Sequence, residues 1–118
     1  MLVSDNTKDA SLNYIKNNTT EFHYCSQEPA TYAEATITYS LGYKTSPTIT
    51  GPTGTPRAIT IEAFLDGLAT GTGVATYWAL VSGVELIATN ALSASLNVVL
   101  GFSMGIDEYD INATAISN

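Results

Sequence analysis

The stretch LSASLNVVL, residues 92–100, decides the fold class of this chain. Apolar residues at its even-numbered positions alternate with serine and asparagine, and this two-residue period is typical of a half-buried β-strand. The stretch GVATYWALV, residues 73–81, is apolar on both faces. A strand of that kind lies centrally in a sandwich or beneath a subunit contact.

Shorter strands surround these two segments, with turn signals at residues 66–67 (Asp-Gly) and 82–83 (Ser-Gly). Short strands at about ten-residue spacing, separated by such turns, are typical of sandwiches and jelly rolls. We therefore expect a mainly β protein, a jelly-roll-like β-sandwich. The additional strands are expected at residues 21–26, 59–63, 85–89 and 102–112.

A short N-terminal helix is expected before the strands. Asp9 can cap a helix over about residues 10–18, which places Leu12 and Ile15 on one face and Lys16 on the other. Because the chain has 118 residues, we expect one domain, residues 1–118.

Two segments in the first half of the chain have unusual patterns. Thr31 and Glu34 form a capping-box pattern that predicts a short helical turn, although residues 36–39 also resemble a strand. Residues 44–57 contain three prolines and two glycines, which disfavour both a helix and most ladder pairing. We expect an exposed, extended Pro/Gly/Thr loop at residues 45–56.

The charge balance excludes several partners. Four Lys and Arg residues stand against eleven Asp and Glu residues, which gives a net charge of −7 at pH 7. Nucleic-acid binding and anionic membrane binding both depend on clustered basic groups, so neither partner is expected. The sequence has no apolar run of about 18 residues and no signal-peptide pattern, so no membrane segment is expected either.

Candidate catalytic chemistry is sparse. His23 and Cys25 are the sole histidine and cysteine, so the chain can form no internal disulfide and no Cys/His zinc site. A Cys–His dyad with Glu21 on the same strand face is conceivable, but we expect structural roles for both. Asp107, Glu108 and Asp110 could suggest a calcium site. Strand alternation, however, would separate these carboxylates between the two faces of a solvated edge strand. We expect no enzyme activity and no cofactor.

Aromatic residues are the other candidate binding groups. Trp78 lies in the middle of an apolar strand and is expected in the core. A glycan-binding β-sandwich would instead need exposed aromatic rings. That alternative rests on five tyrosines: Tyr24, Tyr32, Tyr39, Tyr43 and Tyr109.

Five segments together resemble a known family: LNYIKNN (12–18), YCSQEPATYAEA (24–35), YSLGYK (39–44), GVATYWAL (73–80) and LIAT (86–89). In this order they resemble small, mostly uncharacterised proteins encoded among the structural genes of tailed bacteriophages. The resemblance spans about residues 11–111, and its motifs are not catalytic. It implies a virion structural protein, foremost a capsid decoration or cement protein, with a neck or tail component as the alternative.

A cement protein clamps neighbouring copies of the major capsid protein, so contact area matters more than chemistry. The resemblance implies a location on the capsid exterior, after synthesis in the bacterial host cytoplasm. Contacts with the capsid are expected along the Pro/Gly/Thr loop, at Lys44, Pro47, Ile49, Pro52 and Arg57.

A homo-oligomer, a dimer or trimer, is also expected. The strand at residues 73–81 carries apolar side chains on both faces, and one face could lie against another protomer. The expected subunit interface consists of Ala75, Tyr77, Ala79 and Val81.

Overall fold

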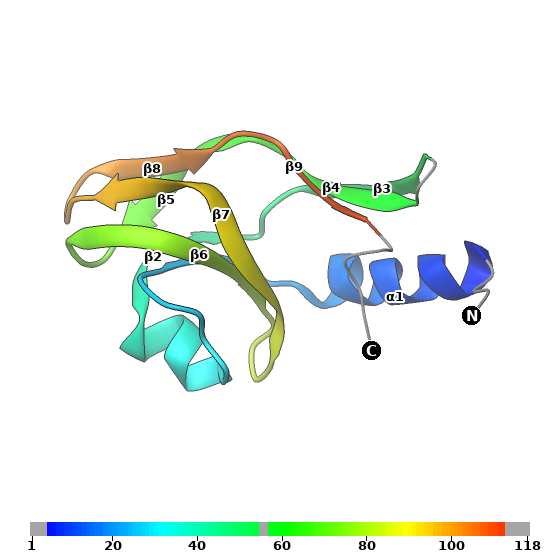
Figure 1. Ribbon diagram of the computed structural model, residues 1–118, viewed down its shortest axis with the longest axis horizontal. Helices are drawn as coiled ribbons and strands as arrows, with labels where there is room; N and C mark the ends of the chain where they lie inside the picture. Colours follow the sequence, from blue (N-terminus) through cyan, green and yellow to red (C-terminus); the bar gives the residue numbers. More distant parts are fainter. Residues whose placement is uncertain (1–4, 55–56, 113–118) are drawn as a thin grey trace.

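The computed structural model describes residues 5–54 and 57–112, without the side chains of residues 5–8 and of Ser93. The chain is mainly β and has one N-terminal helix (Figure 1). In chain order the elements are α1 (Asp5–Asn18), β1 (Glu21–Cys25), the π-helical turn η1 (Glu34–Thr38), β2 (Ser40–Thr45), β3 (Ile49–Thr53), β4 (Ala58–Ile61), β5 (Phe64–Ala69), β6 (Gly73–Val81), β7 (Leu86–Val98), β8 (Ser103–Ile106) and β9 (Tyr109–Asn112).

The strands form two antiparallel sheets in a sandwich-like arrangement, as the sequence predicts at this coarse level. The larger sheet has six strands in the order β7-β6-β1-β2-β5-β8, and the smaller has the order β3-β4-β9. The larger sheet is strongly curved, so that its two edge strands, β7 and β8, run beside one another (Figure 1). The helix α1 lies along the smaller sheet.

One hydrophobic core joins the helix and both sheets. Leu12 of α1, Ile59 of β4, and Phe22 and Leu80 of the larger sheet are all at most 1% exposed and belong to one cluster. Trp78 belongs to the same cluster and is 3% exposed, so its expected place in the core is confirmed. The helix therefore contributes to the same core as the strands.

The helix is longer than the sequence suggests. It begins at Asp5, so the prediction that Asp9 caps a helix starting at residue 10 is wrong. Asp9 instead lies inside the helix and accepts hydrogen bonds from Arg57. Leu12 and Ile15 are buried, as predicted. None of the described helices is long and apolar enough to cross a membrane.

The Pro/Gly/Thr stretch is not an exposed loop. Residues 49–53 form β3, which pairs with β4 through Ile49↔Ile61 and Thr50↔Thr60. Ile49 is 9% exposed and belongs to the core. β3 is an edge strand, so it pairs with β4 and has no neighbour on its other side. Proline lacks an N–H, and an edge strand tolerates it because it has no second strand to bond. Residues 55 and 56 of the predicted loop lie outside the described residues.

The two faces of β6 are exchanged part-way along the strand. The register with β7 shifts between Ala75 and Tyr77: Ala75 pairs with Leu96 and Tyr77 pairs with Ala91, so the extra residues of this irregularity lie in β7. As a result Ala75 joins the same core cluster as Trp78, whereas strict alternation would put them on opposite faces. A second, smaller cluster on the opposite face of the sheet is covered by residues around η1; its members include Cys25, Ala35, Ala79 and Val81.

Other strand boundaries also differ from the prediction. The predicted strands at 85–89 and 92–100 are one strand, β7, and the predicted strand at 102–112 is two, β8 and β9. The predicted turn at Asp66-Gly67 lies inside β5. A Cβ atom on Gly67 would lie 2.9 Å from the carbonyl oxygen of Met104, so glycine permits the close approach of β8 here.

Candidate functional site

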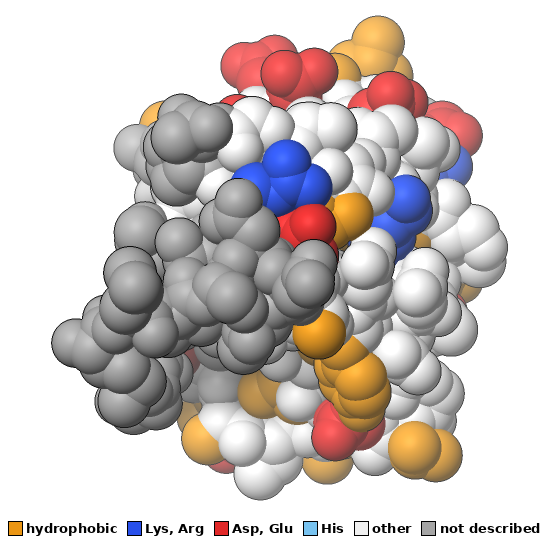
Figure 2. Space-filling model, turned by 90° about the vertical axis from the view of Figure 1, so that its right-hand side faces the viewer, with side chains coloured by type: hydrophobic (Ala, Val, Ile, Leu, Met, Phe, Trp, Pro, Cys, Tyr) orange, Lys and Arg blue, Asp and Glu red, His pale blue; other side chains and the backbone are white. Residues whose placement is uncertain are grey.

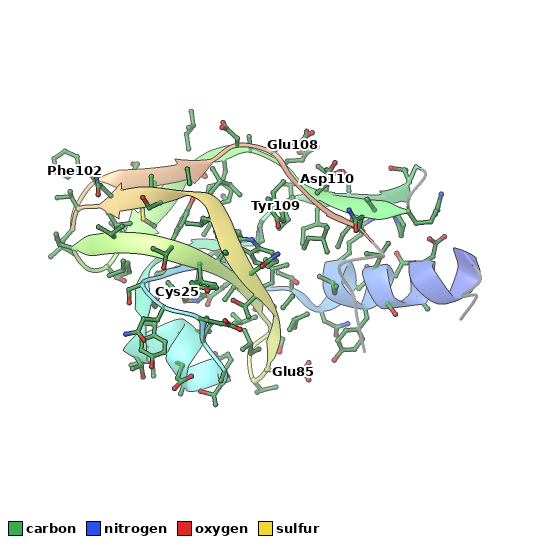
Figure 3. The ribbon with its side chains drawn as sticks, in the orientation of Figure 1. Cys25, Glu85, Phe102, Glu108, Tyr109 and Asp110 are labelled. Carbon is green, nitrogen blue, oxygen red and sulfur yellow. The ribbon has the colours of Figure 1, made fainter. Side chains whose placement is uncertain are left out.

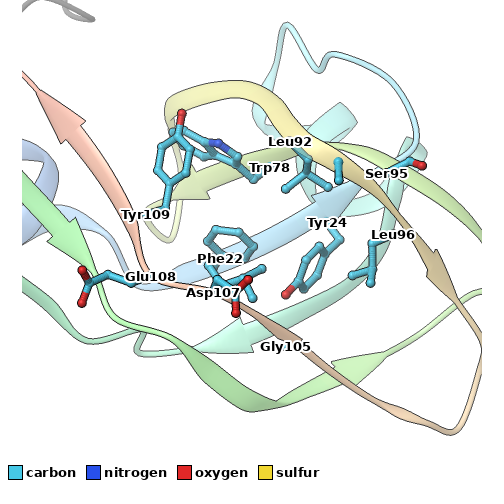
Figure 4. Close-up of a pocket in the computed structure, with 12 residues that line it drawn as sticks. Phe22, Tyr24, Trp78, Leu92, Ser95, Leu96, Gly105, Asp107, Glu108 and Tyr109 are labelled. Carbon is cyan, nitrogen blue, oxygen red and sulfur yellow. The ribbon is translucent and has the colours of Figure 1, made fainter.

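A pocket opens between the two edge strands of the larger sheet (Figure 4). Its volume is about 230 Å³. One wall comes from Leu92 and Leu96 of β7, and the other from Gly105 and Ile106 of β8. The pocket lies where the curved sheet approaches closure, between strands that follow one another in the chain.

Four aromatic side chains form the floor of the pocket. The rings of Phe22 and Tyr24 meet edge-to-face with centroids 5.1 Å apart. Phe22 stacks on Trp78 at 6.3 Å, and Trp78 meets Tyr109 edge-to-face at 5.4 Å. Tyr109 begins β9, so this contact joins the larger sheet to the smaller one. The floor therefore consists of aromatic rings that pack directly against one another.

Two polar atoms of this floor have no hydrogen-bond partner. They are the Tyr24 hydroxyl and the Trp78 indole Nε1, and both atoms are buried. Burial also raises the pKa of the Tyr24 hydroxyl, so it stays protonated at neutral pH. A buried donor without an acceptor costs about 1–3 kcal/mol. Both donors therefore need an acceptor that the described residues do not supply.

The rim of the pocket is acidic. Asp107 and Glu108 lie in the short connection between β8 and β9, and both are exposed. The Glu108 carboxylate points away from the rings, whereas the Tyr24 hydroxyl lies on the side of Asp107 (Figure 4). The described residues that line the pocket include no lysine and no arginine. This electrostatic environment disfavours an anion.

The His23 and Cys25 side chains have separate environments. His23 is 4% exposed; its Nδ1 lies 2.8 Å from Ser40 Oγ and its Nε2 lies 3.0 Å from Glu21 Oε1. Cys25 Sγ instead lies 3.6 Å from the carbonyl oxygen of Ala35. Burial raises the pKa of the Cys25 thiol to about 12, so the reactive thiolate is scarce at neutral pH.

The expected capsid-contact residues are mostly engaged within the chain. Lys44 Nζ donates to Asp66 Oδ2 at 3.0 Å, and Arg57 Nη2 donates to the carbonyl oxygen of Pro52 at 3.0 Å. Ile49 is buried, while Pro47 and Pro52 are half-buried. These residues do not form a protruding arm, because β3 is held against β4.

The expected subunit interface is likewise covered within the protomer. Ala75, Ala79 and Val81 are fully buried, and Tyr77 is half-buried. Ala75 lies in the main core beyond the register shift between β6 and β7, and the chain around η1 covers the others. The apolar character of both faces therefore reflects packing inside one chain.

The remaining predicted candidates are dispersed. Tyr24 and Tyr109 contribute to the pocket, but Tyr32 and Tyr39 pack around η1 and Tyr43 stacks on His23. Within the described part of the chain, these five tyrosines therefore form no single row of rings for a glycan. The described residues contain no group of three or more potential metal ligands.

One end of the molecule carries an apolar surface. We call it the apolar tip; it consists of Leu68, Val74, Val99, Leu100 and Phe102, each at least 46% exposed. These residues lie on or near the β7–β8 connection, because Leu68 pairs with Ser103, Val74 pairs with Asn97 and the Leu100 N–H donates to Thr72 Oγ1. Phe102 lies at the end of the molecule that is far from α1 (Figure 3). At the α1 end, the hydrophobic atoms drawn in colour are scattered among polar ones (Figure 2).

Comparison with family models, with curated proteins and with solved structures finds no match for this chain. The pocket and the apolar tip are therefore the features that bear on its function.

Sequence reasoning did not identify the pocket or the apolar tip. Alternation places Phe22 and Tyr24 on one face of β1, and this was the available signal for an aromatic floor. The tip depends on how β5, β6 and the β7–β8 connection meet in space.

Proposed function

We propose that this protein is a bacteriophage virion structural protein, a capsid decoration or cement protein that binds neighbouring copies of the major capsid protein. It acts on the capsid exterior after synthesis in the bacterial cytoplasm, and it works by contact rather than by catalysis. The jelly-roll topology expected from the sequence stays a prediction within this proposal.

The apolar tip is the observation that carries this proposal. Soluble monomers rarely expose contiguous apolar side chains, and larger exposed patches mark interaction sites. Here Phe102 is 68% exposed and Leu100 is 60% exposed, on a molecule that is 45 Å long and 25 Å wide. An elongated protein with an apolar end can insert that end between capsid subunits.

The charge distribution supports binding to a protein partner rather than to nucleic acid. Among the described basic side chains, Lys16 donates to the carbonyl oxygen of Gly51, Lys44 pairs with Asp66 and Arg57 pairs with Asp9. Net negative charge also limits non-specific binding to DNA. We place the contact with the capsid at the apolar tip instead of at residues 45–56.

The proposal also includes a homo-oligomer, but with its subunit interface at a different strand from the one expected from the sequence. The strand β7 is an edge of the larger sheet and has no charged residue, proline or glycine over its thirteen residues. Charged residues and proline, two of the usual features that prevent pairing with another strand, are therefore absent from this edge, whereas the irregular register at residues 92–95 is a third such feature that is present. Two copies could therefore associate through β7 rather than through the covered face of β6.

Capsid binding tests the proposal directly. Purified protein is mixed with capsids that lack it, and the bound fraction is measured by co-sedimentation. The variant Phe102→Ser is compared with the matched control Val84→Ser, since Val84 is 86% exposed but lies in the connection between β6 and β7. We expect weaker binding for Phe102→Ser only. Unchanged binding by Phe102→Ser, or no binding by the unaltered protein, would contradict the proposal.

A further inference from the structure

We propose that the pocket between β7 and β8 binds a small, uncharged cyclic molecule that carries a hydrogen-bond acceptor. This binding is separate from attachment to a capsid and does not require it. The inference combines the size of the pocket, the chemistry of its walls and the two unpartnered donors that belong to residues lining it.

The size of the pocket limits the ligand to one ring with a short substituent. The volume is about 230 Å³. A cavity of about 150 Å³ is sufficient for benzene in another protein. The additional space accommodates a small substituent, whereas a drug-sized molecule needs a pocket of about 300 Å³ or more.

The walls of the pocket favour an apolar ring. Phe22, Trp78 and Tyr109 present aromatic carbon, while Leu92 and Leu96 of β7 present aliphatic carbon. A ring placed here would gain contacts on two sides, as in most small-molecule sites, which are mainly apolar with a few polar groups that fix orientation.

The two unpartnered donors specify the polar group of the ligand. The indole N–H of Trp78 can only donate, and the Tyr24 hydroxyl is free to donate because no described residue accepts from it. Tyr24 and Trp78 both line the pocket, and their donor atoms are buried, so an acceptor would reach these atoms from the pocket once the rings shift slightly. A carbonyl oxygen has two lone pairs and could accept from either donor.

Charge at the rim selects a neutral ligand. The carboxylates of Asp107 and Glu108 repel an anion, and the lining contains no basic side chain to offset them. A cation would be attracted to the rim and to the rings, but it would leave both donors without an acceptor. A neutral ketone or amide on a ring satisfies all three conditions.

Nuclear magnetic resonance can test this inference on the intact chain. Trp78 is the sole tryptophan, so its indole N–H gives one cross-peak in a spectrum of nitrogen-15-labelled protein. Acetophenone is titrated as the probe, and ethylbenzene is the matched molecule without an acceptor. Benzoate and phenyltrimethylammonium test the effect of charge.

We expect a saturable shift of the Trp78 indole resonance with acetophenone, in the direction of a stronger hydrogen bond. Binding of ethylbenzene and of benzoate should be weaker by about fivefold or more, as expected for loss of a hydrogen bond or for charge repulsion. Equal binding of acetophenone and ethylbenzene would overturn the inference, because the donors would then play no part. Tightest binding of phenyltrimethylammonium, or no saturable shift with any probe, would overturn it as well.

Two variants make the result specific to the pocket. Tyr24→Phe keeps the ring and removes the hydroxyl, so we expect acetophenone to bind several-fold more weakly. The matched control is Tyr32→Phe, since Tyr32 packs near η1 and does not line the pocket. Ala94→Phe adds a ring at an exposed lining position and should block binding while the protein stays folded. Unchanged binding in both Tyr24→Phe and Ala94→Phe would place the ligand elsewhere.

Discussion

Arg57 binds both carboxylate oxygens of Asp9, with its Nε 2.8 Å from Oδ1 and its Nη2 2.9 Å from Oδ2. The two residues are 48 positions apart in the chain. Because Asp9 belongs to α1 and Arg57 directly precedes β4, this paired hydrogen bond fixes the helix to the smaller sheet. Such two-point contacts give geometric specificity as well as binding energy.

The first prediction concerns the charge of Asp9. The hydrogen bond from Arg57 lowers the pKa of Asp9 below its ordinary value of 3.8. Its stabilising effect should therefore be complete above about pH 4 and lost as the pH falls through the lowered folded-state pKa. We expect Asp9→Asn to lower the unfolding midpoint in urea at pH 7, and to differ less from the unaltered protein at about pH 2.5.

Asp66→Asn is the matched control for this prediction. Asp66 also pairs with a basic residue, Lys44, but its side chain is 72% exposed, against 27% for Asp9. Solvent weakens such exposed pairs, so the loss of stability should be smaller. Equal losses in the two variants at pH 7 would show that the Asp9 pair has no special role.

The second prediction concerns β3. Ile49→Ala should lower the free energy of unfolding by about 2–4 kcal/mol, because it removes a buried side chain from the core. Thr50→Ala, next along the strand but exposed, should change it by less than about 1 kcal/mol. Urea unfolding followed by circular dichroism measures both. A negligible effect of Ile49→Ala would mean that β3 is not part of the folded core.

The third prediction compares two tyrosines that differ in their partners. Tyr24→Phe removes a buried hydroxyl without an acceptor, so the free energy of unfolding should stay the same or rise by up to about 1 kcal/mol. Tyr14→Phe should lower the stability, since the Tyr14 hydroxyl donates to Glu85 Oε1 at 2.7 Å. Thermal unfolding of both variants gives the comparison. Marked destabilisation by Tyr24→Phe would reveal a partner for its hydroxyl inside the protein.

The fourth prediction concerns the thiol of Cys25. This side chain is fully buried, and its raised pKa of about 12 keeps it protonated at neutral pH. A thiol reagent such as 5,5′-dithiobis(2-nitrobenzoic acid) should therefore not react with the native protein at pH 8, and should react with one thiol per chain in urea. Rapid reaction in the native state would restore Cys25 as a candidate nucleophile.

Period-two alternation predicted the strand character of residues 92–98, although Ala94, on the face expected to be buried, is exposed. Local turn signals were less reliable. Asp66-Gly67 has the composition of a turn, yet both residues lie in β5. A glycine is present there because the backbone of β8 approaches too closely for a side chain. Tertiary contact overrode the local preference there.

The candidate sites were harder to predict than the strands. The sequence pattern places Ala75 in the expected subunit interface, but the alternation along β6 reverses at its register shift with β7, and such an irregularity has no clear signature in this stretch. The sequence pattern predicts that Ile49 belongs to a capsid-binding loop, because prolines surround it. Its position on an edge strand, where proline is tolerated, becomes evident only when β4 is placed beside it.

The copy number of this chain in particles tests the proposed function most directly. The proposed function implies a phage that encodes this chain; its virions are purified, and quantitative mass spectrometry compares the amount of this chain with that of the major capsid protein. For a decoration protein, we expect a copy number per particle of the same order as that of the capsid protein. A few copies per particle would indicate a neck or tail component, and absence from the particle would contradict a virion role altogether.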